Sequence, residues 1–297
     1  MSNQNQLITY AVVALVIGAA VGYLAAGPIT YNKQIQDLQN QLAAGGEAEL
    51  IGTLSIAGST TVLPISQECA NLFMEQHSKV AISVAGGGSG AGVKSAGSGE
   101  VDIGEASRNI KASELLSYPD LVAFSVSKDS VAVVINPDNP LAGGLDLTLE
   151  QVSEIFSGDI NNWSELGGPD HEIEVYTREE GSGTREVFVD YTMGGKEFAA
   201  NAGVKPSNGE MRAAVASNHY AIAYVSLGYI DDTVSAARIN GVEAVVENVN
   251  NGQYPITRIL WMFTKGMPDE LEAAFIEYIQ GSEGQAVVED LGYIPIY

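Results

Sequence analysis

Cysteine is almost absent from this sequence, since Cys69 is the only one among 297 residues. A single cysteine excludes an intrachain disulfide, so packing and hydrogen bonds must stabilise the fold. Cys69 falls at helical spacing with Ile65, Leu72 and Phe73. This spacing predicts a buried thiol with a structural role.

Basic residues are also scarce: 14 lysines and arginines stand against 37 acidic residues, which gives a formal net charge of −23. Nucleic-acid binding is excluded as a function, because no basic stripe is present to neutralise phosphates. An anion bound by such a chain gains nothing from long-range attraction and needs a local site. Four of the cations lie in or beside glycine-rich turns: Lys94, Arg108, Arg178 and Arg185.

The signatures of common enzyme classes are missing. The glycine-rich run at 86–92 is not a nucleotide phosphate loop, because one residue separates Gly92 from Lys94. Neither Ser89 nor Ser182 has the flanking glycines of a hydrolase nucleophile elbow. The three histidines show no zinc-ligand spacing. We therefore expect no catalytic residue, no cofactor and no metal site, and a function in binding.

One long apolar run is present, from Leu7 to Gly27, and it contains no charged residue. As a helix it would span roughly 30 Å, the thickness of a bilayer core. This predicts a single transmembrane anchor at residues 1–29, with the rest of the chain outside the cell membrane. A cleaved secretory signal is the alternative, although the run is long and no basic residue precedes it. Residues 30–50 are polar with helical spacing and predict a short stalk.

From residue 53 onward, short β-branched runs alternate with helical patterns. The runs predict strands at 53–57, 79–85, 101–104, 121–126, 131–135 and 172–176. Helices are expected to begin at Val62-Leu63-Pro64 and at Thr148, where Gln151 completes a capping box, and to follow near 210–216, 269–280 and 285–291. This alternation indicates an α/β protein with mostly parallel sheets, whose ligands lie beyond the carboxyl ends of the strands.

Three of the strand-to-helix turns carry the same chemistry, namely hydroxyls and glycines at a helix start. They are the turn at Ser59, Thr60 and Thr61, the turn at Ser89, and the turn at 178–184 with Arg178, Ser182, Gly183 and Thr184. Free N–H groups and the helix dipole make each such turn a natural seat for an anion. A helix-capping role explains any one of them equally well. Three together predict one shared anion site.

With these turns in view, the sequence resembles the substrate-binding proteins of phosphate ABC transporters, which have a periplasmic-binding-protein-like type II fold. The matching segments follow one another in the order of that family and cover about residues 51–297. They are 57–64, 86–108 (GGGSGAGVKSAGSGEVDIGEASR), 155–158 with Asn162-Trp163, 178–184 (REEGSGT), 284–285 and 292–295.

The resemblance implies two α/β lobes joined by a hinge, with phosphate held in the cleft between them. Lobe 1 is expected at residues 51–129 and 249–297 and lobe 2 at 130–248, to within about ten residues. The resemblance assigns phosphate binding to Ser59, Thr60, Thr61, Ser89 and Arg108 in lobe 1 and to Arg178, Ser182, Gly183 and Thr184 in lobe 2. It also implies an ABC permease and an ATPase as partners.

One position departs from part of this family, because some members have Asp where this chain has Arg108. An aspartate can accept the proton that phosphate retains near neutral pH, whereas arginine only donates. Glu105, Glu180 or Asp102 is the candidate substitute. Receptors for another tetrahedral oxyanion such as sulfate, molybdate or tungstate therefore remain an alternative. A non-transport surface sensor or adhesion protein of the same fold is a further one.

Overall fold

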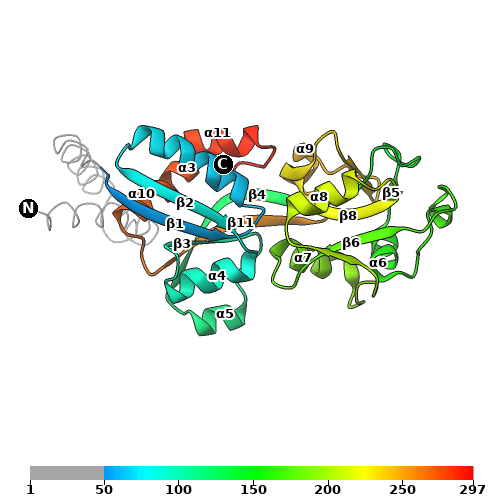
Figure 1. Cartoon of the computed structure of the whole chain (residues 1–297), viewed down its shortest axis with the longest axis horizontal. Helices are drawn as coiled ribbons and strands as arrows, with labels where there is room; N and C mark the ends of the chain where they lie inside the picture. The colour runs from blue at the N-terminus through cyan, green and yellow to red at the C-terminus, as the bar shows by residue number, and fades with distance from the viewer. Residues whose placement is uncertain (1–49, 297) are drawn as a thin grey trace, which may run out of the picture.

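A computed structural model describes residues 50–296. Most of its strands form one twisted sheet in the order β2-β1-β3-β11-β4-β8-β6-β7, with the short β9 (Ser235–Ala236) paired to β4. Figure 1 shows that this sheet joins two halves, each covered by its own helices. The sequence predicted two mixed or mostly parallel sheets, one in each lobe. The mixture of parallel and antiparallel neighbours agrees with this, whereas the strands run through the middle as one continuous sheet.

The first half is built on three parallel strands, β1 (Gly52–Gly58), β2 (Val80–Gly86) and β3 (Ile103–Ala106). Its main core lies on the sheet face that carries helices α3 (Leu63–Gln76), α10 (Glu270–Gln280) and α11 (Ser282–Asp290). Cys69 is fully buried there, as predicted, and burial raises the pKa of its thiol to about 12. A smaller core lies under α4 (Ser89–Ser98), near the short α5 (Ala112–Ser117).

The second half contains β8 (Ala221–Ser226), β6 (Glu174–Arg178) and β7 (Gly203–Lys205), which are also parallel. Its core is separate from that of the first half and includes the stacked rings of Phe188 and Tyr224. The helices of this half are α6 (Leu149–Ser157), α7 (Gly183–Phe188), α8 (Asn208–Ala216) and α9 (Val246–Asn250). A small two-stranded sheet is formed by β5 (Asp146–Leu147) and β10 (Arg238–Ile239).

Two long strands belong to both halves. β4 (Leu121–Ile135) pairs with β11 (Thr257–Lys265) along residues 121–130 and with β8 along 131–135. The sequence predicted two strands here, at 121–126 and 131–135, because polar residues interrupt the apolar pattern. The strand continues since Asp129, in that polar stretch, is buried opposite Arg258 of β11. The link between the halves is therefore a pair of strands.

The helix starts agree with the local signals in the sequence. Thr148 caps α6 through its side chain, and the Gln151 side chain accepts the Thr148 N–H in return. Pro64 lies in the first turn of α3. α8 begins two residues before its expected start, directly after its cap Ser207, and α11 begins three residues before its own, after Gly281, which provides no side-chain cap.

The expected anchor at residues 1–29 lies outside the described residues, as does the expected stalk at 30–50 apart from Leu50. Among residues 50–296, no helix has both the length and the apolar character needed to cross a bilayer.

Candidate functional site

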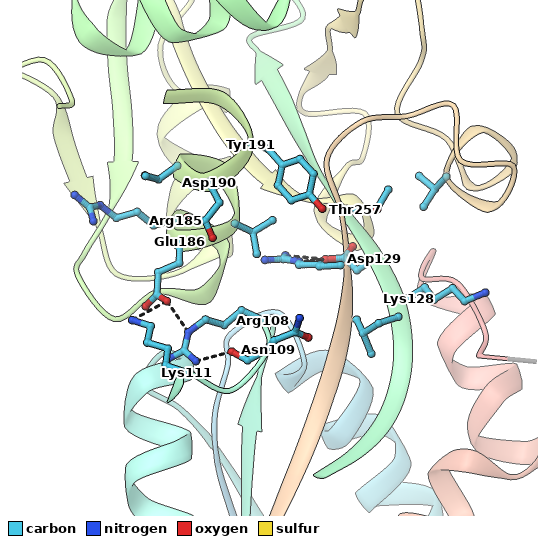
Figure 2. Close-up of a pocket in the computed structure, with 15 residues that line it drawn as sticks. Arg108, Asn109, Lys111, Lys128, Asp129, Arg185, Glu186, Asp190, Tyr191 and Thr257 are labelled. Carbon is cyan, nitrogen blue, oxygen red and sulfur yellow. Dashed lines mark hydrogen bonds and ion pairs between the residues drawn. The ribbon is translucent and has the colours of Figure 1, made fainter. Parts of the chain in front are cut away.

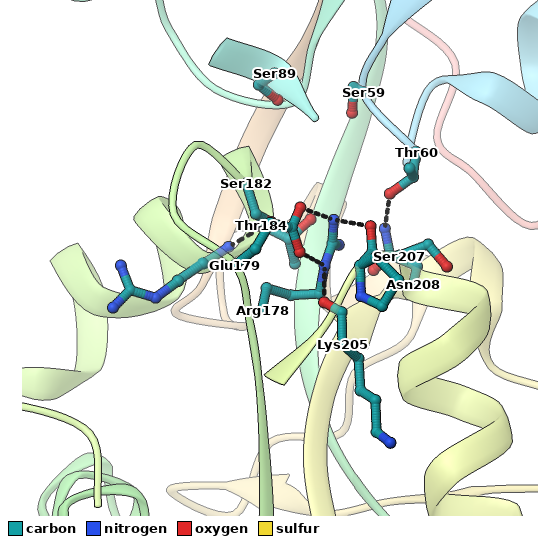
Figure 3. Close-up of polar contacts among 12 residues, drawn as sticks. Ser59, Thr60, Ser89, Arg178, Glu179, Ser182, Thr184, Lys205, Ser207 and Asn208 are labelled. Atoms are coloured by element: carbon teal, nitrogen blue, oxygen red, sulfur yellow. Dashed lines mark hydrogen bonds and ion pairs between the residues drawn. The ribbon is translucent and has the colours of Figure 1, made fainter. Parts of the chain in front are cut away.

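The three predicted turns come together where the two halves meet (Figure 3). Thr61, before α3, lies 3.1 Å from Thr184 of α7, measured between their Oγ1 atoms. The backbone N–H of Gly90 in α4 donates to the carbonyl of Gly181, at 3.0 Å. The hydroxyl residues of the three turns are between 1% and 8% exposed: Ser59, Thr60, Thr61, Ser89, Ser182 and Thr184. The structure thus gathers these predicted residues into one buried polar region.

Glycines allow the turns to approach so closely. Gly58 ends β1 with a φ of +143°, and a side chain there would collide with the backbone of Glu105. Gly183 begins α7, and a side chain there would overlap Ser89 of the first half. Ser182 caps α7 by accepting the Arg185 N–H at 3.3 Å. Gly183 is therefore needed for the contact between the halves, whichever ligand the region takes.

Arg178 is a buried cation of this region, with 2% of its surface exposed. Its Nε and Nη2 donate to the two carboxylate oxygens of Glu179 at 3.0 and 2.8 Å. The same two nitrogens donate to the carbonyls of Lys205 and Pro206. Nη1 is buried and has no hydrogen-bond partner among the described residues. One edge of a fixed positive charge is thus left free for a ligand.

Arg108 lies at the edge of the same interface but is engaged by two carboxylates, of which Figure 2 shows Glu186. Its Nη1 and Nη2 donate to Glu114 at 2.8 and 2.6 Å. Its Nε lies 2.7 Å from Glu186 Oε2, an ion pair without hydrogen-bond geometry. Burial by itself raises the pKa of Glu114, but the hydrogen bonds from Arg108 and Lys111 hold it below its usual value. The charge of Arg108 is therefore balanced within the protein.

The three carboxylates considered as proton acceptors lie in different environments. Asp102 accepts the backbone N–H and the hydroxyl of Ser55, so its carboxylate is engaged on the first half alone. Glu180 is exposed in the turn before α7. Glu105 is fully buried and accepts the Ser66 hydroxyl of α3, while its Oε2 has no partner among the described residues. Burial raises the pKa of Glu105 to about 8, and the Ser66 hydrogen bond offsets only part of this rise.

Three residues of this region were missed by the sequence analysis, namely Asn208, Arg258 and Asp129. Asn208 begins α8, and its Nδ2 donates to Thr61 Oγ1 at 2.9 Å. Arg258 donates to Thr184 Oγ1 and Thr61 Oγ1 at 3.0 and 3.2 Å and pairs with Asp129 at 2.7 Å. One sequence signal exists for Arg258, because it occupies the buried face of a strand on which the next two residues, Leu260 and Met262, are apolar.

A cavity of about 760 Å³ lies beside this region, between the two halves (Figure 2). Its walls include Arg108 and Lys111 of the first half, Glu186 and Tyr191 of the second, and Arg258 of β11. Of the predicted site residues, only Arg108 lines it. Among residues 50–296, no group of three or more His, Cys, Asp or Glu side chains is arranged to hold a metal ion.

Comparison with known proteins identifies similar chains. The family model described as "PBP superfamily domain" matches residues 43–283. The phosphate-binding protein PstS of Bacillus subtilis is 35% identical over 259 residues, which cover 86% of this chain and 85% of that protein. The protein of the same name from Pseudomonas aeruginosa strain PAO1 is 28% identical, with 82% and 83% covered.

Solved structures agree with this. A Clostridium perfringens substrate-binding protein assigned to phosphate ABC transport, solved with bound phosphate, superposes with a TM-score of 0.78 at 36% identity. The match covers 83% of this chain and all of that one. An ABC-type phosphate transport receptor from Vibrio cholerae gives a TM-score of 0.67 at 32% identity, with 81% and 99% covered.

Proposed function

This chain belongs to the PBP superfamily and, within it, to the PstS family of phosphate-binding proteins, and we propose that it captures inorganic phosphate for an ABC importer. Phosphate is bound between the two lobes and delivered to a permease that an ATPase subunit drives. The protein acts by binding and release, with no chemical step. Its relatives carry the names of binding proteins and transport receptors.

The observation that carries the proposal is the free edge of the buried Arg178, in the region where the hydroxyl-bearing turns of both halves meet (Figure 3). We assign phosphate binding to Arg178, Ser182, Gly183 and Thr184 on one side and to Ser59, Thr60, Thr61 and Ser89 on the other. Charge-assisted hydrogen bonds contribute about 1.5–3 kcal/mol each. Because micromolar affinity needs only about −8 kcal/mol, a few such bonds suffice after the ordering losses. Arg108 is proposed to act at the rim of the site by holding Glu114 and Glu186, since these carboxylates balance its charge.

The lobes are proposed as residues 51–129 with 249–297 and residues 130–248. Two separate hydrophobic cores support this division in outline, since one draws on residues 54–126 and 260–293 and the other chiefly on 131–256. They move the second crossing between the lobes from residue 249 to about residue 256, within the ten residues allowed for it. The hinge is then the middle of β4 and the start of β11, around Asp129 and Arg258. A strand pair can twist without losing its hydrogen bonds, which suits a closing motion.

We further propose that the binding lobes face the outside of the cell, with residues 1–29 as a membrane anchor or a signal segment. An anchored receptor stays close to its permease, so that capture and delivery occur at the same membrane. Only the liganded, closed shape is expected to dock productively, because ligand binding shifts the population toward it.

A second candidate is a receptor for another tetrahedral oxyanion. It is favoured by one observation: at the position where some family members have Asp, this chain has Arg108, whose charge is used by Glu114 and Glu186. Sulfate carries no proton near neutral pH, so it needs no acceptor at that position.

Isothermal titration calorimetry on the full-length chain tests both candidates. Inorganic phosphate is expected to bind with a dissociation constant in the micromolar range or below. Titrations with sulfate, arsenate, molybdate and tungstate are expected to show at least tenfold weaker binding. No heat and no thermal shift at millimolar phosphate would exclude the proposal, and tighter binding of sulfate would favour the second candidate.

A further inference from the structure

Thr61 and Thr184 form a hydrogen-bonded pair whose direction is fixed by neighbours that can only donate. Each hydroxyl carries one hydrogen and can accept two hydrogen bonds. Thr61 Oγ1 is approached by Asn208 Nδ2 at 2.9 Å and by Arg258 Nη2 at 3.2 Å. Both nitrogens are donors, so they fill both acceptor positions of Thr61. Its own hydrogen must therefore point to its third contact, Thr184 Oγ1 at 3.1 Å.

Both acceptor positions of the Thr184 hydroxyl are occupied in the same way. Its Oγ1 accepts the hydrogen of Thr61 and a second hydrogen from Arg258 Nη1 at 3.0 Å. The hydrogen of Thr184 has no acceptor among the hydrogen bonds of the described residues. Because both residues are 1% exposed, water does not compete freely for that hydrogen. It is left for a ligand in the region beside Arg178.

The two donors are themselves held in one orientation. Asn208 Oδ1 accepts the backbone N–H of Ser226 at 3.1 Å, which decides which end of the amide faces Thr61. Arg258 Nε donates to Asp129 Oδ2 at 2.8 Å, and the carboxylate of Asp129 also accepts the Ser226 hydroxyl. Asn208 and Asp129 are fully buried. The Asn208 amide therefore cannot flip to present its oxygen to Thr61, and the Arg258 guanidinium, which has no acceptor, cannot rotate away.

We propose that Asn208 and Arg258 are positioning residues that direct the Thr184 hydroxyl hydrogen onto the bound anion, with Thr61 as the intermediate. This inference rests on the proposed function, because it assumes an anion in the site. This arrangement also affects which ligands bind, because the part of the site at Thr184 offers only hydrogen-bond donors. A ligand oxygen that carries a proton must face another part of the site, and a ligand without acceptors there is rejected.

Asn208→Asp tests the direction of the chain of hydrogen bonds. At high pH the new carboxylate accepts the Thr61 hydrogen, so Thr184 donates to Thr61 and no longer to the anion. Protonation at low pH returns a donor. The titratable groups around this cluster are unchanged between the variants: Arg258 and Asp129, Arg178, Glu105, Tyr229, which donates to the Thr60 carbonyl, and Tyr293, which donates to the Thr61 carbonyl. We expect phosphate affinity at least tenfold below that of the wild type at pH 8.5, and within threefold of it at pH 5.5.

Ser207→Asp is the matched control for charge. Ser207 is next to Asn208 and caps α8 by accepting the Glu210 N–H at 3.0 Å, a role that aspartate also fills. It has no hydrogen bond to Thr61 or Thr184 among those of the described residues. We expect less than a threefold loss of affinity at both pH values. An equal loss in both variants would assign the effect to charge alone and overturn the proposal.

The measurements are phosphate titrations by calorimetry on the full-length chain, with circular dichroism to verify folding. If the wild type gives no binding, the proposed function fails and the positioning roles fall with it. Two other outcomes would contradict only the positioning roles. In one, the wild type binds and Asn208→Asp matches its affinity at pH 8.5; in the other, Asn208→Asp has the same loss of affinity at pH 5.5 as at pH 8.5.

A second variant decides the question if Asn208→Asp does not fold. Arg258→Lys keeps the charge beside Asp129, but an ammonium group cannot hold the two hydroxyls in the fixed geometry of a guanidinium. We expect at least a fivefold loss of phosphate affinity, whereas Arg212→Lys, in an exposed pair with Asp231, stays within twofold of the wild type. Wild-type affinity for Arg258→Lys would overturn the proposal.

Discussion

Arg108 and Glu186 face one another across the two halves of the molecule, with Arg108 Nε 2.7 Å from Glu186 Oε2. Lys111 Nζ lies 2.8 Å from the same oxygen. Arg108 follows β3 of the first half, and Glu186 belongs to α7 of the second. This ion pair therefore exists only while the halves are in contact, and it links closure to charge at the rim of the site.

Glu186→Gln is expected to weaken phosphate binding about three- to tenfold. Removing the carboxylate leaves Arg108 and Lys111 without their shared partner, and a partly exposed ion pair contributes on the order of 1 kcal/mol. That energy favours the closed form, so its loss reduces the apparent affinity. Calorimetry measures the change. Glu243→Gln, in an exposed pair with Arg238 in the second half, is the control and should bind like the wild type.

Arg178→Ala is expected to reduce the free energy of phosphate binding by at least about 2 kcal/mol, or roughly thirtyfold in affinity. The reason is the loss of the buried cation whose Nη1 is free for the ligand. His77→Ala, at the end of α3, should leave the affinity unchanged. Affinity of Arg178→Ala within threefold of the wild type would remove this residue from the binding site.

Asp129→Ala is expected to lower the free energy of unfolding by about 3–5 kcal/mol, because it leaves the charge of Arg258 buried and unpaired. Urea denaturation followed by circular dichroism measures this. Asp231→Ala provides the comparison, since Asp231 pairs with Arg212 near the surface and should change stability by about 1 kcal/mol or less. Equal effects of the two substitutions would show that the buried pair of Asp129 and Arg258 stabilises the protein no more than a surface ion pair.

Glu105 is expected to make the protein less stable as the pH rises from about 4.5 to 8. In the folded protein its pKa is raised to about 8 by burial, against a usual value of 4.5. The folded state therefore binds this proton more tightly than the unfolded state, and the resulting stability is present below pH 4.5 and lost as the pH rises through 8. The slope is at most on the order of 1.4 kcal/mol per pH unit.

Glu105→Gln removes this titration, because glutamine resembles the neutral carboxyl. Urea unfolding at pH 5.5, 7 and 8.5 should show the free energy of unfolding falling more steeply for the wild type than for the variant. Parallel curves would mean that Glu105 ionises in the folded protein as it does in the unfolded chain. Glu100→Gln, at an exposed position, should follow the wild-type curve.

Local chemistry is what the sequence revealed on its own. The capping box at Thr148 and Gln151, the proline in the first turn of α3 and the glycines of the turns each depend on residues a few positions apart. The burial of Cys69 followed from helical periodicity in the same way. The order of the turn motifs also identified the family, because each segment is recognisable without its neighbours in space.

The tertiary structure alone decided how these pieces are joined. Arg258 reaches Thr184 and Thr61 across 74 and 197 positions of the chain, and Asn208 reaches Thr61 across 147. No local pattern encodes such contacts. The same holds for β4. Its local polarity predicted two strands, but it is one strand, because Arg258 of β11 pairs with the buried Asp129 at the predicted break. A buried charge is tolerated only where a distant residue pairs with it, so its place becomes visible only once the chain has folded.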